Sequence, residues 1–104
     1  MEQLLHYVWK HKIFPLSALQ TTSGRPVEVI DPGLPNMNAG PDFFNAKLKI
    51  DGTLWVGNVE VHTQASEWLL HRHDCDKAYD TVILHVVGES NCDVYRTNGE
   101  LVPQ

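Results

Sequence analysis

The segment from Pro41 to His62 constrains the fold of this chain more than any other part of it. Residues 45–50 and residues 54–62 have the composition of strands, and Asp51-Gly52 between them is a strong hairpin turn signal. An antiparallel hairpin folds its two ends together. The residues that open the first strand are therefore expected to lie beside those that close the second.

The register of this hairpin depends on the length of its loop. A two-residue loop, Asp51-Gly52, would pair Lys49 with Leu54 and mix charged with apolar residues on each face. A three-residue loop that also includes Ile50, with a bulge, pairs Lys49 with Thr53 instead. A slip of one residue moves every side chain to the other face of the strand. The side-chain pattern favours the three-residue loop.

In this register the open end of the hairpin carries a small group of metal-ligand side chains. Asp42 lies opposite Glu60, and His62 follows two positions later on the same face. Carboxylate oxygens suit magnesium or manganese, whereas a histidine ligand favours zinc, manganese or iron. His62 could also act as a general base. The alternative is that Asp42 caps a turn, Glu60 is a solvated strand end and His62 hydrogen-bonds a neighbour.

A second group of potential metal ligands lies in residues 71–76, where histidines, aspartates and a cysteine are concentrated. Zinc could be held by His71 and His73 with one further ligand, either His62 or His85. The alternative is that this segment is a solvated polar loop. His85 lies inside an apolar strand, where a histidine is most often a buried residue whose hydrogen bonds are satisfied.

Length and charge limit the classes of function. The chain has 104 residues, which suits one domain, and we expect residues 1–104 to be the N-terminal domain of a longer protein. The remaining domains of that protein would be its partners. The net charge of −5 argues against a dominant surface for nucleic acid, so a nucleic-acid partner gains no support from charge.

Other features bear on the cellular location. No apolar run is long enough to span a membrane, and residues 1–12 lack the features of a signal peptide. Cys75 and Cys92 have no metal-binding spacing and are expected to be reduced thiols. We therefore expect a cytoplasmic protein that does not have a membrane as a partner.

The order of the expected elements predicts an α+β, or mixed α/β, domain. An N-terminal helix over residues 2–14 precedes a three-strand antiparallel meander, whose first strand is residues 27–30. A helix or turn over residues 66–70 leads to a strongly apolar strand at residues 81–87, which reads as a central strand covered on both faces. A hairpin over residues 92–102 ends the domain.

This order of elements, with Pro41-Asp42 opening one strand and Glu60-Val61-His62 closing the next, resembles the PD-(D/E)XK nuclease-like fold. The resemblance implies that Asp42 and Glu60 bind one or two divalent cations, usually magnesium. His62 stands where the family pattern has the lysine that helps polarise the attacking water. The implied function is a metal-dependent nuclease or phosphodiesterase with Asp42, Glu60 and His62 as catalytic residues. The alternatives are a non-catalytic binding or scaffold domain on a nuclease-like core, and a zinc-binding domain.

Four segments of the chain resemble a second family, namely Asn38–Phe43, Gly57–His62, Trp68–His73 and Ile83–Val87. They are similar to the N-terminal part of a Bacteroidetes-type family whose members are longer than this chain. That family carries only a domain-of-unknown-function label. The resemblance therefore implies an intracellular bacterial protein and supplies no activity.

Overall fold

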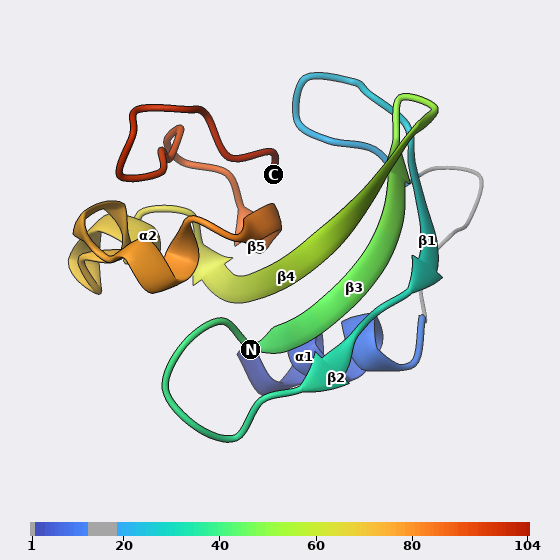
Figure 1. Ribbon diagram of the computed structural model, residues 1–104, viewed down its shortest axis with the longest axis horizontal. Coiled ribbons are helices and arrows are strands. Elements are labelled where there is room, and N and C mark those ends of the chain that lie inside the picture. The colour runs from blue at the N-terminus through green and yellow to red at the C-terminus, as the bar shows by residue number, and fades with distance from the viewer. Residues whose placement is uncertain (1, 13–18) are drawn as a thin grey trace.

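The computed structural model describes residues 2–12 and 19–104, which form a twisted sheet with helices packed on it (Figure 1). The elements in chain order are α1 (Glu2–Lys10), β1 (Val27–Asp31), β2 (Leu34–Pro35), β3 (Phe43–Ile50), β4 (Thr53–Gln64), α2 (Glu67–Leu70), the 3-10 helices η1 (His73–Cys75) and η2 (Lys77–Tyr79), and β5 (Val82–Glu89). The N-terminal helix and the sheet of five strands confirm the predicted α+β class.

α1 begins where predicted and ends at Lys10, and the last two residues of the predicted helix lie outside the described part of the chain. Cys75 and Cys92 are free thiols, as predicted. Within the described residues, no helix has the length and apolar character needed to cross a membrane.

The strands have the order β1-β3-β4-β5, and the short β2 also pairs with β3. β1, β3 and β4 are antiparallel neighbours, which confirms the predicted meander. β5 runs parallel to β4, and the segment containing α2, η1 and η2 connects the two. The predicted central position of β5 is wrong, because β5 ends the order. Its apolar sequence instead reflects burial on both faces, and its outer edge is partly covered where His85 N donates to Pro103 O at 2.8 Å.

The predicted three-residue loop between β3 and β4 is also wrong. The loop is the two-residue turn Asp51-Gly52, whose φ angles of 52° and 81° suit a tight hairpin. Lys49 consequently pairs with Leu54, which is the mixed arrangement that the side-chain pattern disfavoured. This pairing of a charged with an apolar residue is tolerated because the face of the hairpin that carries it is solvated, with Leu54 and Val56 exposed by 54% and 60%.

A β-bulge at Asn45 compensates for the shorter loop. Asn45 has a left-handed φ of 59°, and the register of β3 against β4 shifts by one residue between Phe43 and Ala46. Because a bulge adds one residue to one strand, the side chains beyond it change partners by one position. Asp42 therefore comes opposite Glu60 as predicted, although through a bulge within the strand and not through the loop.

The two faces of the sheet have separate cores. α1 covers one face, where Trp9 packs with Val59, Val61 and other buried apolar residues. The segment that contains α2 and the 3-10 helices covers the other face near β5, where Trp68 and Tyr79 are buried. Since side chains alternate along a strand, the residues next to the buried valines of β4 point toward α2. Those residues are Glu60 and His62.

The predicted C-terminal hairpin is a turn with one isolated bridge, between Tyr95 and Leu101. Arg96 attaches this turn to the rest of the domain. Its guanidinium group donates to the backbone oxygens of Asp80, Val82 and Leu101 at 3.1, 2.7 and 3.1 Å. The turn is thereby held against the start of β5.

We expect Arg96→Lys to lower the free energy of unfolding by about 1–3 kcal/mol, because a lysine lacks the planar fork that reaches all three oxygens. Urea unfolding at neutral pH measures the difference. Arg25→Lys is the matched control, since Arg25 is exposed and its hydrogen bonds within the described residues are made by its backbone. Equal free energies of unfolding for the two variants would contradict this role of Arg96.

Candidate metal site

β4 and β5 place three polar side chains on the face of the sheet that α2 covers. Glu60 and His62 are two residues apart on β4 and are exposed by only 4% and 2%. His85 pairs with Glu60 across the parallel strands and is fully buried. Burying a carboxyl or imidazole group without a partner costs free energy. The hydrogen bonds within this polar site therefore offset the cost of burying these groups in the folded protein.

The Glu60 carboxyl group lies at the centre of the site. Its Oε1 accepts a hydrogen bond from the Asp42 backbone N–H at 3.1 Å. Its Oε2 lies 3.2 Å from His62 Nε2 and 3.0 Å from His73 Nε2. The structure thus brings Glu60 and His62 together with His73, a member of the second predicted group, for which His62 was one of two possible further ligands.

Burial keeps the groups of this site neutral near pH 7. Burial, followed by the negative charge of Asp42, raises the pKa of Glu60 to about 9. Burial, followed by the neighbouring His85, lowers the pKa of His62 to about 3, and burial also lowers the pKa of His73. The contact between Glu60 and His73 is therefore a hydrogen bond between neutral groups, and the approach of His62 Nε2 to Glu60 Oε2 is not an ion pair. Neutral imidazole is also the form that binds a metal ion.

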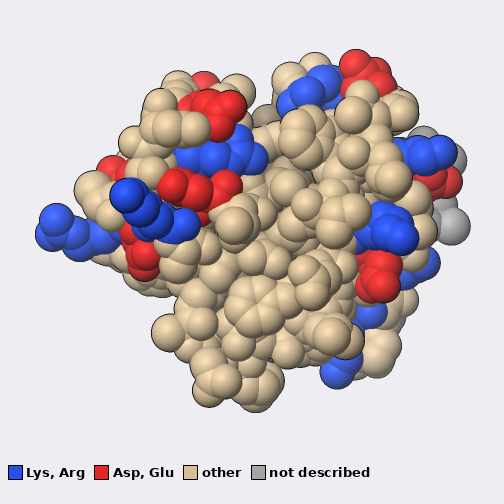
Figure 2. Space-filling view, viewed as in Figure 1, with Lys and Arg blue, Asp and Glu red and all other residues tan. Residues whose placement is uncertain are grey.

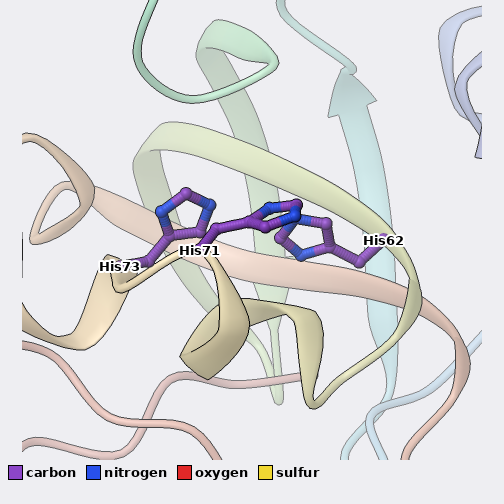
Figure 3. A group of neighbouring side chains, drawn as sticks. All are labelled: His62, His71 and His73. Carbon is purple, nitrogen blue, oxygen red and sulfur yellow. The ribbon is translucent and has the colours of Figure 1, made fainter.

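His71 joins His62 and His73 to form a group of three histidines (Figure 3). One ring nitrogen from each residue lies within 4.8 Å of those from the other two. The His62 and His73 rings are stacked with centroids 5.4 Å apart, and the His71 ring meets the His62 ring edge-on at 5.1 Å. His71 is exposed while the other two are buried, so the group can be reached from solvent on one side.

A short turn after α2 brings His71 and His73 to the same place. His71 caps α2 and His73 begins η1, while Arg72 between them has a left-handed φ of 60°. The His73 ring stacks on Tyr79 with centroids 3.6 Å apart. His73 Nδ1 is buried and has no hydrogen-bond partner among the described residues. A buried polar nitrogen without a partner costs about 1–3 kcal/mol, so this position would gain from a ligand.

Asp42 lies at the rim of the site. Its Oδ2 accepts a hydrogen bond from the Val61 backbone N–H at 2.8 Å and lies 3.5 Å from His6 Nε2. His6 comes from α1 and was not predicted to be near the site. The sequence pattern of α1 shows that this helix is amphipathic. It does not show where the helix crosses the sheet.

His85 and Glu60 contact different nitrogens of the His62 ring. His85 Nε2 is 2.7 Å from His62 Nδ1, whereas the other nitrogen of the His62 ring faces Glu60. His85 is therefore in contact with His62 but is not a member of the group of three histidines.

Comparisons with known proteins bear on the family of the chain. No curated protein and no solved structure matches it. The resemblance to a nuclease-like fold and the bacterial source therefore stay predictions, while the predicted likeness to a family of unknown function is confirmed. The model of the family described as "Protein of unknown function (DUF2851)" matches residues 2–104, so the chain belongs to this family.

Proposed function

We propose that this domain binds one zinc ion through His62, His71 and His73, with Glu60 beside the ion. The observation that carries this proposal is the group of three histidine nitrogens within 4.8 Å of one another. Imidazole nitrogens are common zinc ligands, and catalytic zinc sites combine three protein ligands with a fourth position open to water or substrate. A nitrogen-rich group of this kind favours zinc over magnesium.

The spacing of the donor atoms supports a zinc ion. Ligands about 2.0–2.1 Å from a tetrahedral zinc ion lie roughly 3.3 Å from one another. Glu60 Oε2 already lies 3.2 Å from His62 Nε2 and 3.0 Å from His73 Nε2. His71 is exposed and free to adjust toward them, and His73 could offer either nitrogen because its Nδ1 has no partner in the described part of the chain.

Glu60 determines what such a site could do. A bound zinc ion would supply a Lewis acid and lower the pKa of a water molecule next to it. Burial keeps a proton on the Glu60 carboxyl group when no cation is near, since its pKa is raised to about 9. A cation beside it would favour the carboxylate form. Glu60 could then serve as a fourth ligand or accept a proton from water.

A magnesium- or manganese-dependent nuclease or phosphodiesterase is the second candidate. It is favoured by Asp42 opposite Glu60, with His62 beside Glu60, because these are the residues that the nuclease-like resemblance implies. Its substrate would be nucleic acid or another phosphodiester. Figure 2 shows one face on which Lys and Arg lie among Asp and Glu, with a broad area between them that carries neither. This face offers little attraction for a polyanion.

Titrating chelator-treated protein with zinc, magnesium and manganese separates the two candidates. We expect one zinc ion per chain, measured by elemental analysis and by competition with a chromogenic chelator, and weaker binding of the other two ions. Zinc should also shift the NMR signals of the His62, His71 and His73 rings. Saturable magnesium binding that leaves the NMR signals of His71 and His73 unchanged, and that is lost in Asp42→Asn, would favour the hydrolase. No saturable binding would leave a non-catalytic binding or scaffold domain.

A further inference from the structure

A series of buried hydrogen bonds leads from the C-terminal segment to the His62 ring. Gln104 Nε2 lies 2.7 Å from the backbone oxygen of Cys92 and 2.9 Å from Ser90 Oγ. Gln104 Oε1 lies 2.9 Å from His85 Nδ1, and His85 Nε2 lies 2.7 Å from His62 Nδ1. The side chains of Gln104, His85 and His62 are all buried, so water does not compete for these contacts.

The direction of each hydrogen bond follows from the Gln104 end. The Cys92 atom is a carbonyl oxygen, which only accepts, so the Gln104 atom facing it is the amide nitrogen. Gln104 Oε1 is therefore the acceptor for His85, and His85 Nδ1 must carry a hydrogen. His85 is fully buried, which favours its neutral form with a single N–H. His85 Nε2 is then a lone pair that accepts from His62 Nδ1.

The remaining nitrogen of His62 is fixed by the same reasoning. A neutral His62 that carries its hydrogen on Nδ1 has a lone pair on Nε2. This Nε2 lies 3.2 Å from Glu60 Oε2, the same oxygen that lies 3.0 Å from His73 Nε2. His73 has no comparable support, because its Nδ1 has no hydrogen-bond partner among the described residues. The effect therefore applies to His62 and not to His73.

We propose that Gln104 and His85 are positioning residues that fix His62 in the Nδ1–H tautomer and hold its Nε2 lone pair toward Glu60 Oε2. The purpose of this arrangement rests on the proposed function, since Nε2 is then the nitrogen that His62 offers to zinc. Histidines that bind metals almost always donate their other N–H to an acceptor, which orients the ring and raises its basicity. Here the acceptor is a second histidine, which is itself oriented by a glutamine.

Nitrogen-15 NMR of the metal-free protein tests the tautomers directly, because a ring nitrogen with a hydrogen resonates apart from one without. We expect His62 and His85 both to carry the hydrogen on Nδ1. Gln104→Leu removes the acceptor for His85, so we expect His62 to lose its single tautomer and zinc affinity to fall about 10–100-fold. Ser90→Ala is the matched control, because the Cys92 oxygen still orients the amide.

A hydrogen on Nε2 of His62 in the unmodified chain would overturn the proposal, and so would an unchanged His62 tautomer in Gln104→Leu. The spectrum of the unmodified chain decides the question by itself if Gln104→Leu does not fold. The expected tautomers without zinc binding would support the positioning role and remove the zinc function. Zinc binding with the hydrogen on His62 Nε2 would keep the zinc function and remove the positioning role.

Discussion

Replacing His62 with glutamine is expected to weaken zinc binding by more than about a hundredfold. Changing a residue that only supports a metal ligand typically costs 10–100-fold in affinity, and removing a ligand should cost more. Glutamine has no imidazole lone pair, but it keeps an N–H that can reach His85 Nε2, where His62 Nδ1 now lies at 2.7 Å. Competition with a chromogenic chelator, after urea unfolding has shown that the variant folds, measures the loss.

The other histidines provide the comparison for this result. His73→Gln should cause a similar loss, and His71→Gln a smaller one, because the exposed His71 is less firmly held than the two buried rings. His11→Gln is the matched control, since His11 is exposed and its ring packs against Tyr7 of α1. Zinc affinities in His62→Gln and His73→Gln equal to that of the His11 control would place the ion outside this site.

The position of Asp42 opposite Glu60 could be predicted from the sequence, but not the path by which the chain reaches it. For Asp42 to face Glu60, the β3 side of the hairpin needs one extra residue, and the predicted register places that residue in the loop. Asp51-Gly52 accepts the tighter turn without strain, and the extra residue is accommodated at Asn45 instead. The Asn45 N–H donates to the Asn58 side chain at 3.1 Å, so two asparagines facing each other across the strands were the available signal.

The site combines residues that local patterns could predict with residues that only tertiary packing reveals. Alternation along β4 places Glu60 and His62 on one face, and composition alone singles out the histidines that follow α2. These histidines and the two β4 residues form one site only because α2 and η1 fold back over β4. There the centroid of the Trp68 ring lies 5.4 Å from that of His73 and 5.0 Å from that of His85. Gln104 comes from a distant part of the chain, and no periodicity in the sequence relates it to His85.

Metal-free protein is expected to lose stability as the pH rises from about 6.5 to about 9, and Glu60 is the cause. The pKa of this carboxyl group is raised from its ordinary value of 4.5 to about 9 in the folded protein. Between these two values the folded state holds a proton that the unfolded state has released. The free energy of unfolding therefore falls with rising pH, by at most about 1.4 kcal/mol per pH unit.

The buried histidines make the free energy of unfolding rise with increasing pH below about pH 6.5, opposite to the effect of Glu60. Their ordinary pKa is 6.5, and burial lowers the pKa of His62 to about 3 and of His85 to about 4. Below pH 6.5 the unfolded state takes up protons that the folded state does not, so stability falls as the pH decreases. Together the two effects place the maximum stability of the metal-free protein near pH 6.5.

Urea unfolding of chelator-treated protein between pH 4 and pH 9 tests this profile. Glu60→Gln imitates the protonated carboxyl group, so it should remove the fall in stability above pH 6.5. It should also steepen the rise between about pH 4.5 and pH 6.5, where Glu60 opposes the effect of the histidines. Glu28→Gln, at an exposed position on β1, should reproduce the profile of the unmodified chain. A constant free energy of unfolding from pH 6.5 to pH 9 would show that Glu60 is ionised in the folded protein. A cation favours the carboxylate form of Glu60. Saturating zinc should therefore remove the fall in the free energy of unfolding above pH 6.5 in the unmodified chain only if the ion lies next to Glu60.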